Sequence, residues 1–249
     1  MIETDNCKLY NGDCLEIMKQ IEDKSIDMIL CDLPYQCTAN KWDKIIPFDE
    51  LWKQYNRIIK KDGAVLLFGN QPFVTKLIDS NIDNYKYSWY WIKNQGTNFF
   101  HAKHMPIRKV EEICVFNNYS TYNIIKSKGH LPTQYSKGSS NGKCYYGTKK
   151  RNYVGGDTER FPIDVLDFKC VNNYERQHPT QKPVALCEYL IKTYTNENMV
   201  VLDNCMGSGT TGVACKKLNR KFVGIELDEK YFEISKNRIE NTVIEQELF

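Results

Sequence analysis

Short apolar runs alternate along the chain with stretches in which apolar residues recur at helical spacing. Continuous apolar runs are typical of strands that are covered on both faces, whereas the wider spacing is typical of amphipathic helices. The runs predict strands at Ile26–Cys31, Ala64–Phe68, Tyr87–Trp91, Ile113–Phe116, Val200–Leu202 and Phe222–Ile225. The wider spacing predicts helices at Phe48–Lys60, Pro183–Tyr194 and Tyr231–Ile239. This alternation predicts an α/β fold with a mainly parallel sheet.

The middle of the chain breaks this pattern, because glycine, serine, asparagine and tyrosine accumulate there. We predict a loop-rich insert at 118–177 that separates 1–117 from 178–249, the two halves of one domain. Basic and aromatic residues are interleaved in it: Lys143, Tyr145, Tyr146, Lys149, Lys150, Arg151 and Tyr153. A plain surface excursion would explain the insert, but this interleaving favours substrate recognition. Lys143, Lys149, Lys150 and Arg151 are then candidate contacts to a polyanion.

Composition and charge exclude few function classes. Hydrophobic residues make up 41% of the 249 residues, which is enough for a sizeable core. The formal net charge of +3 is compatible with a nucleic-acid partner without requiring one. No apolar stretch has the length of a membrane helix, and the polar start Met1–Asp5 does not resemble a secretory signal. We therefore expect a cytoplasmic protein that is not bound to a membrane.

The cysteines and histidines do not form an evident metal-binding pattern. None of the ten cysteines is arranged as C-x-x-C, and Cys31, Cys114 and Cys187 lie in apolar runs. Buried free thiols in a reducing compartment explain them better than disulfides or zinc ligands. His101 and His104 could share a helix face, but no ligand set accompanies them. We expect no bound metal.

The first candidate for chemistry is Asp32-Leu33-Pro34-Tyr35, directly after a predicted strand. Ligands of open α/β sheets bind at the carboxyl ends of strands. A carboxylate and a neighbouring backbone carbonyl there can accept both hydrogens of a planar amino group, and Tyr35 could stack on the ring that carries it. A strand-ending turn is an equally good explanation of this tetrapeptide alone.

The second candidate is the segment Asp203–Gly212, in which a strand leads into a glycine-rich turn and then a helix. Its glycines allow the backbone to approach a ligand closely. The next strand ends at Glu226, where an acid can bind ribose hydroxyls. Together these features indicate an adenosine-containing cofactor. The absence of a lysine after the glycines argues against triphosphate binding.

A third segment, His178-Pro179-Thr180-Gln181-Lys182-Pro183, precedes a predicted helix. Its two prolines restrict the turn, and Thr180 could cap the helix. The segment indicates no particular chemistry by itself.

Taken together and in this order, the segments resemble the amino-methylating DNA methyltransferases of the permuted beta class. In that family a D-P-P-Y-type catalytic motif precedes the cofactor glycine motif, as Asp32–Tyr35 precedes Asp203–Thr211 here. His178–Pro183 resembles the family's H-P-x-x-K-P segment, and Asn11–Cys14 resembles its early G-D motif. The resemblance implies a Rossmann-like, circularly permuted fold with helices on both faces of the sheet. It also places the family's target-recognition region at the insert.

The resemblance further implies S-adenosylmethionine as cofactor and double-stranded DNA as substrate, with the target base flipped out of the helix. Asp32, Leu33, Pro34 and Tyr35 would be catalytic. The residues implied to bind the cofactor are Asp13, Cys14, Asp32, His178, Thr180, Lys182, Asp203, Cys205, Gly207, Ser208, Gly209, Thr210, Thr211, Glu226 and Leu227.

One position departs from the family pattern, because Leu33 stands where the second residue is usually proline. The family uses the backbone carbonyl of that position, which leucine also provides. The first residue, Asp32, is commoner in adenine-specific members, so we expect transfer to the adenine amine.

Two other functions fit parts of the pattern. Methylation of a glutamine amide in a protein uses a similar turn, but those enzymes keep the glycine motif first. A DNA-binding regulator on a decayed scaffold is disfavoured by the intact Asp32, Tyr35 and Glu226. A homodimer and a cognate restriction enzyme are compatible with the sequence, which decides neither.

Overall fold

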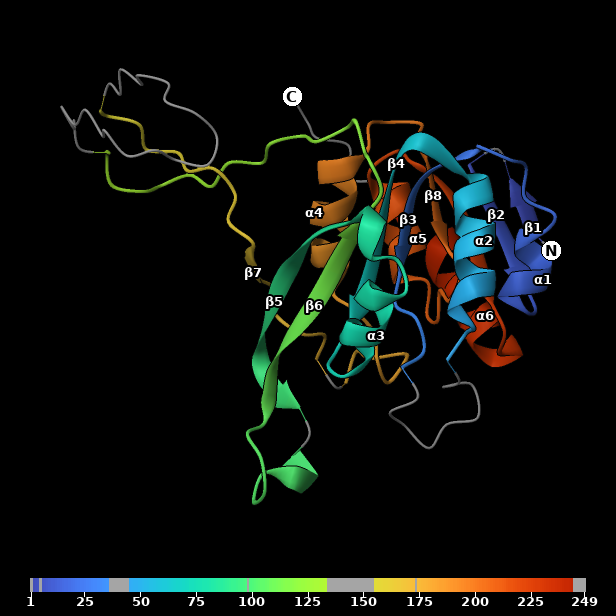
Figure 1. Cartoon of the computed structure of the whole chain (residues 1–249), viewed down its shortest axis with the longest axis horizontal. Helices are drawn as coiled ribbons and strands as arrows, with labels where there is room; N and C mark the ends of the chain where they lie inside the picture. The colour runs from blue at the N-terminus through green and yellow to red at the C-terminus, as the bar shows by residue number, and fades with distance from the viewer. Residues whose placement is uncertain are drawn as a thin grey trace. The chain divides into compact units, whose positions relative to one another are not determined.

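The computed structural model describes residues 2–4, 6–35, 45–97, 99–133, 155–172 and 174–243 (Figure 1). The chain forms two compact units, one of Met1–Asn123 with Asp164–Phe249 and one of Ile124–Ile163. The smaller unit spans fewer residues than the insert predicted at 118–177. Its described residues contain an isolated antiparallel bridge between Ser127 and Arg160.

In the larger unit the described strands form one sheet in the order β1-β2-β9-β8-β3-β4-β6-β5-β7. Their bounds are β1 Ile2–Thr4, β2 Cys7–Asn11, β3 Ile26–Cys31, β4 Ile59–Gly69, β5 Tyr85–Thr97, β6 Arg108–Phe116, β7 Val165–Asp167, β8 Val200–Asp203 and β9 Lys221–Glu226. The run from β2 to β4 is parallel, and β7 pairs in parallel with β5. β1 and β6 are antiparallel to their neighbours. The predicted α/β fold with a mainly parallel sheet is confirmed.

Helices cover both faces of this sheet. They are α1 Cys14–Met18, α2 Phe48–Ile58, α3 Phe73–Asp79, α4 Val184–Tyr194, α5 Thr210–Lys217 and α6 Glu229–Glu240, with short 3₁₀ turns η1 Ile82–Asn84 and η2 Phe99–His101. Side chains of α4, α5 and α6 share one buried cluster with Met28 and Leu30 of β3. Side chains of α1, α2 and α3 share a second cluster with Ile29 and Cys31. Successive β3 residues thus enter opposite cores, which explains the continuous apolar run Met28–Cys31.

Parallel pairing brings the functional segments to one edge of the sheet. β2, β9, β8 and β3 are consecutive parallel neighbours, so their carboxyl ends lie side by side. The chain leaves β3 for β4 on one side, whereas β8 flanks β3 on the other. Such a switch point is where open α/β sheets bind ligands. Asp13, Asp32, the turn after Asp203, and Glu226 all follow or end these strands.

The observed elements correct several local predictions. The helix predicted at Phe48–Lys60 ends at Ile58, because Ile59 adopts an extended backbone and begins β4. The helix predicted at Pro183–Tyr194 begins at Val184 with Pro183 as its N-cap. Thr180 does not cap it, so that prediction was wrong. Cys31, Cys114 and Cys187 are buried free thiols, as predicted. Within the described residues, no helix is long and apolar enough to cross a membrane.

Candidate active site

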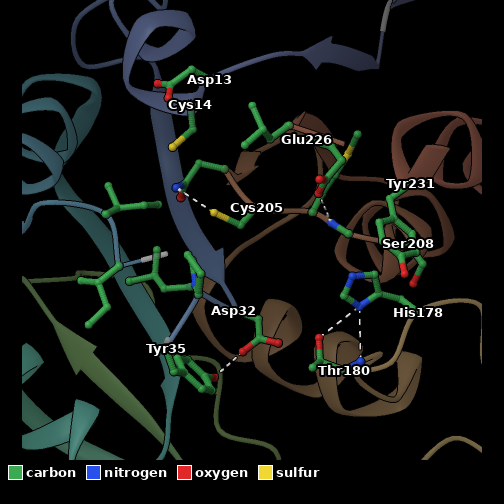
Figure 2. Close-up of a pocket in the computed structure, with 18 of the residues that line it drawn as sticks. Asp13, Cys14, Asp32, Tyr35, His178, Thr180, Cys205, Ser208, Glu226 and Tyr231 are labelled. Carbon is green, nitrogen blue, oxygen red and sulfur yellow. Dashed lines mark hydrogen bonds between the residues drawn. The ribbon is translucent and has the colours of Figure 1, made fainter. Parts of the chain in front are cut away.

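A cavity of about 330 Å³ opens at the carboxyl ends of β2, β3, β8 and β9 (Figure 2). Its volume is within the range of small-molecule sites. The predicted site residues that line it are Asp13, Cys14, Asp32, Leu33, Pro34, Tyr35, His178, Thr180, Cys205, Gly207, Ser208, Thr210, Glu226 and Leu227. Lys182, Asp203, Gly209 and Thr211 are not among its lining residues. The four predicted DNA contacts, Lys143, Lys149, Lys150 and Arg151, lie outside the described residues.

The tetrapeptide after β3 supplies the acidic end of this cavity. The Tyr35 hydroxyl donates a hydrogen bond to Oδ1 of Asp32, and the Tyr35 ring packs against Phe73 with centroids 4.9 Å apart. Leu33 is buried in the core beneath the site. The Leu33 side chain therefore anchors this position of the tetrapeptide in the core, where the family usually has a proline ring.

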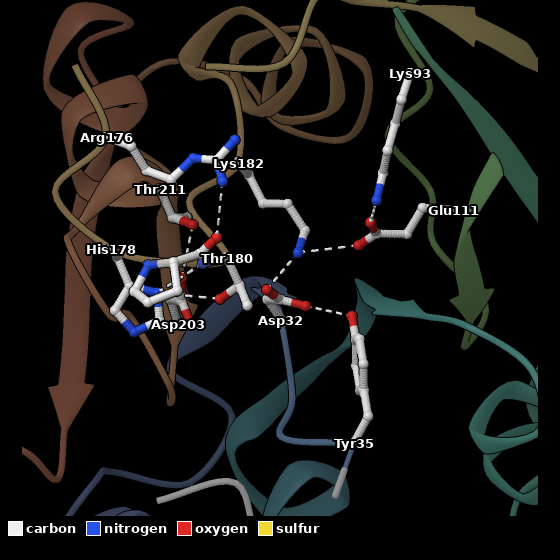
Figure 3. A network of polar contacts seen from close by, with 11 residues as sticks. Asp32, Tyr35, Lys93, Glu111, Arg176, His178, Thr180, Lys182, Asp203 and Thr211 are labelled. Atoms are coloured by element: carbon white, nitrogen blue, oxygen red, sulfur yellow. Dashed lines mark hydrogen bonds and ion pairs between the residues drawn. The ribbon is translucent and has the colours of Figure 1, made fainter. Parts of the chain in front are cut away.

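Lys182, which does not line the cavity, contacts the carboxylate of Asp32 (Figure 3). Its Nζ forms an ion pair with Oδ2 of Asp32 and another, at 2.9 Å, with Oε1 of Glu111. The second Glu111 oxygen lies 2.5 Å from Nζ of Lys93. Burial raises the pKa of Asp32, and the Lys182 charge opposes that rise.

The glycine-rich turn is held together by Asp203, at the end of β8. Its Oδ1 accepts a hydrogen bond from the Cys205 N–H at 3.1 Å, and its Oδ2 accepts one from the Thr211 hydroxyl at 2.7 Å. Burial raises the pKa of Asp203 to about 7. Gly209 adopts φ 75° at the start of α5, and a Cβ there would lie 2.8 Å from Ser235 Cβ. Asp203 and Gly209 therefore shape the turn from behind.

Glu226 connects this turn to the end of β9. Its Oε2 accepts a hydrogen bond from Gly207 N–H at 2.8 Å, and its Oε1 accepts one from Asp228 N–H at 2.9 Å. Burial raises the pKa of Glu226, and the backbone donors oppose that effect. Gly207 has φ 51°, a left-handed backbone that favours glycine. Glu226 and Gly207 thus line the cavity together.

The early acid Asp13 and His178 complete the lining from two other loops. Asp13 caps α1 by accepting hydrogen bonds from Leu15 N–H at 2.8 Å and Glu16 N–H at 3.2 Å. His178 Nδ1 accepts the Thr180 N–H at 3.3 Å. Burial, together with the Lys182 charge, lowers the pKa of His178 to about 4, so the imidazole is neutral near pH 7.

Sequence reasoning missed three residues at or behind the site. Tyr231 lines the cavity and packs edge-on against His178, with centroids 4.2 Å apart. Lys93 and Glu111 stand on the paired strands β5 and β6, where Glu111 is opposite Trp91. Charged residues inside apolar strands are rarely buried unless paired, and this signal could have indicated them.

The comparisons with known proteins decide the family. The sequence profile of the N6/N4 methyltransferases, described as DNA methylase, matches residues 26–237. The chain belongs to this DNA methylase family. It is an S-adenosylmethionine-dependent methyltransferase that acts on amino groups in DNA.

Relatives and solved structures agree with this assignment. The methylase is 27% identical to the Type II methyltransferase M.HpaI of Haemophilus parainfluenzae, over 94% of this chain and 74% of the relative. It is 26% identical to M2.MboI of Moraxella bovis, over 94% and 87%. The M1.HpyAVI–SAM complex is similar with a TM-score of 0.64 and 25% identity, over 94% of this chain and 98% of that one. The cytosine-N4-specific PvuII DNA methyltransferase shares the fold, with a TM-score of 0.68 and 17% identity, over 96% and 89%.

The lining of the cavity fits the cofactor of this family. Glu226 offers carboxylate oxygens that hydroxyl groups can reach, and the turn at Gly207 exposes backbone. Leu15, Leu227 and Tyr231 add apolar and aromatic surface for a flat ring. Acidic, glycine and apolar surfaces of this kind match ribose, methionine and adenine groups.

Proposed function

We propose that the methylase transfers a methyl group to the N6 amine of adenine at a specific site in double-stranded DNA. The observation that carries this proposal is the position of Asp32 and Tyr35 at the cavity that fits the cofactor. An acceptor for amine hydrogens and an aromatic ring for stacking thus line the cavity that would hold the methyl donor. Because that amine is paired inside a duplex, the base has to be flipped out to reach them.

Each site residue then has a role in binding or orientation. Asp32 and the Leu33 carbonyl accept the hydrogens of the amine, and Tyr35 stacks on the base. Glu226 would bind the ribose of the cofactor and Asp13 its adenine end, and Gly207 would line the cofactor turn. S-adenosylmethionine, when bound, supplies an electrophilic methyl group. The remaining lining residues, His178, Thr180, Cys14, Cys205, Ser208, Thr210 and Leu227, enclose the cofactor.

The chain accelerates transfer by placing the amine and by taking up one proton. The amine nitrogen would form a bond to the methyl carbon while the bond between that carbon and the cofactor's sulfur breaks and leaves its electron pair on sulfur. The nitrogen also loses a bond to hydrogen, and the proton goes to Asp32 Oδ1. No residue needs to form a covalent intermediate, so positioning and local electrostatics provide the rate enhancement.

Adenine is favoured over cytosine by the first residue of the catalytic tetrapeptide. Asp32 occupies the position that is commonly aspartate in adenine-specific relatives, as the sequence resemblance implies. The curated relatives are named Type II methyltransferases, which supports a restriction–modification role with a cognate nuclease.

The β5–β6 hairpin is a candidate DNA-binding surface among the described residues. It extends past the sheet (Figure 1). Glu112 pairs with Gly69 at the end of β4, so the described residues 94–97 and 99–110 project beyond the sheet edge that holds the cavity. This segment contains Lys103, Arg108 and Lys109 and no acid. Phe100 is 99% exposed near its tip. Cations with an exposed aromatic side chain suit phosphate contact and insertion beside an unstacked base.

The test is to incubate the protein with methyl-labelled S-adenosylmethionine and duplex DNA of mixed sequence, then digest the DNA to nucleosides. We expect the label in N6-methyl-2′-deoxyadenosine. Label found only in N4-methyl-2′-deoxycytidine would reject adenine, and label in no nucleoside would reject DNA methylation altogether. An equal amount of single-stranded DNA is the matched control for the duplex requirement.

A further inference from the structure

The catalytic carboxylate is the last member of a buried row of alternating charges (Figure 3). The row consists of Lys93, Glu111, Lys182 and Asp32, and each neighbour is joined by an ion pair. The side chains of Lys93, Glu111 and Lys182 are 11%, 4% and 9% exposed, against 20% for Asp32. Only the Asp32 end therefore reaches the cavity.

The ammonium group of Lys182 is fully engaged within this row. It contacts one oxygen of Asp32 and one oxygen of Glu111, and it lies 5.0 Å from the centroid of the Phe68 ring. Lys182 does not line the cavity, although the sequence resemblance implied that it binds the cofactor. Its charge is directed at the catalytic acid instead.

The two oxygens of Asp32 have different partners. Oδ2 is paired with the buried Lys182, whereas Oδ1 accepts the Tyr35 hydroxyl. Tyr35 lines the open cavity, so its hydrogen bond to Oδ1 can be replaced by one from the amine of an incoming base. Lys182 cannot leave Oδ2 without breaking an ion pair of which the lysine side chain is 9% exposed, and breaking a buried pair is costly. Only Oδ1 is therefore available to an incoming amine.

We propose that Lys182 is a positioning residue that holds Oδ2 of Asp32 and keeps this carboxylate ionised, so that Oδ1 receives the amine hydrogen. This inference rests on the proposed function, in which Asp32 accepts that hydrogen. Glu111 and Lys93 anchor Lys182 from the other side and balance its charge. After transfer the proton on Oδ1 returns to water, and Lys182 remains protonated throughout.

The electrostatic surroundings of Asp32 agree with this division of roles. Burial raises the pKa of Asp32; the Lys182 charge lowers it, the Glu111 charge raises it, and the Tyr35 hydrogen bond lowers it. Cys31, Cys187 and Asp203 also interact electrostatically with Asp32. Lys182 is the one cation named among these described groups, so its removal shifts Asp32 toward the neutral acid, which can no longer accept the hydrogen.

The test compares the pH dependence of kcat in wild type, Lys182→Met and Glu111→Gln. Lys182→Met removes the charge that stabilises ionised Asp32. The acidic limb of its kcat–pH profile should therefore move to higher pH by about one unit or more. Glu111→Gln removes a repelling charge, so its limb should move to lower pH. Lys182→Arg, which keeps the charge, should stay near the wild type. Cofactor affinity should change by less than about threefold in all of them.

Several outcomes would overturn the inference. A lower rate in Lys182→Met with an unmoved limb would show a purely structural role. Loss of cofactor affinity with an unmoved limb would show that Lys182 binds the cofactor, as the sequence resemblance implied. Limbs that move in the same direction in Lys182→Met and Glu111→Gln would also contradict it.

A second measurement separates this inference from the proposed function. The carboxyl carbon of Asp32 is titrated by NMR in ¹³C-aspartate-labelled protein and assigned with Asp32→Asn. A higher pKa in Lys182→Met supports the ionisation role even when no DNA is methylated, in which case the proposed function alone fails. An unchanged pKa of Asp32 rejects the inference whether or not the wild type methylates DNA.

Discussion

The hydroxyl of Tyr35 donates a hydrogen bond to Oδ1 of Asp32, the oxygen that we expect to receive the amine hydrogen. The residue that we propose to stack on the base is therefore hydrogen-bonded to the residue that we propose to bind its amine. Under this proposal, entry of the base has to replace that hydrogen bond. Stacking and hydrogen-bond exchange at Tyr35 can be separated by substitution.

Tyr35→Phe keeps the ring and leaves Oδ1 without its internal donor, so kcat should stay within about threefold of wild type. Tyr35→Ala removes the stacking surface, and a loss of about tenfold to a hundredfold is expected. Single-turnover methylation of duplex DNA measures both. Equal losses in the two variants would show that the hydroxyl, and not the ring, carries the role.

Glu226 should control cofactor affinity with little effect on the chemical step. Glu226→Gln weakens an acceptor that faces the cavity and bonds to Gly207 N–H. We expect the Kd for S-adenosylmethionine to rise about tenfold, because hydrogen bonds to charged groups contribute about 1.5–3 kcal/mol. Calorimetry measures the Kd, and Glu229→Gln on the exposed start of α6 is the matched control. Unchanged affinity in Glu226→Gln would remove Glu226 from the cofactor site.

Asp203 should make stability depend on pH. Burial raises its pKa from 3.8 to about 7 in the folded protein, so the folded state holds the proton more tightly than the unfolded state. Its contribution to stability is therefore complete below the lower value and is lost as the pH rises through the higher one. Asp203→Asn should gain up to about 4 kcal/mol relative to wild type across this window. Urea unfolding at several pH values measures the difference, and a difference independent of pH would contradict the prediction.

The exposed Phe100 should contribute to DNA binding and not to folding. Phe100→Ala should weaken binding of duplex DNA by about tenfold, since a stacked base contributes about 1–3 kcal/mol. Fluorescence anisotropy with labelled duplex measures the affinity, and cofactor affinity should not change. Ile82→Ala is the control, because Ile82 is 58% exposed just before β5, at the opposite end of that strand. Equal effects of the two substitutions would exclude a specific hairpin contact.

The sequence predicted the central strands because their residues enter two cores and leave an unbroken apolar run, as in Met28–Cys31. It did not predict β2, where Leu9 alone is fully buried, or the edge strand β7, which has three residues. Their short apolar patterns cannot be told from those of loops, because it is pairing with a neighbouring strand that makes these segments strands.

The site was predicted unevenly for a similar reason. Asp32, Gly207 and Glu226 stand at strand ends or in a glycine turn, so local pattern is enough to find them. The row behind Asp32 joins Lys93 and Glu111 of a β-hairpin to Lys182 in a distant loop. Only the folded sheet brings these charges together, so local pattern could not assign Lys182 to Asp32.

The central claim is that Asp32 directs methyl transfer to adenine in DNA. The most direct measurement compares wild type with Asp32→Ala, using labelled S-adenosylmethionine, duplex DNA and nucleoside analysis, with the cofactor Kd determined for both. We predict labelled N6-methyl-2′-deoxyadenosine from the wild type and none from the variant, at equal cofactor affinity. Label confined to cytosine, or undiminished transfer by Asp32→Ala, would contradict the account.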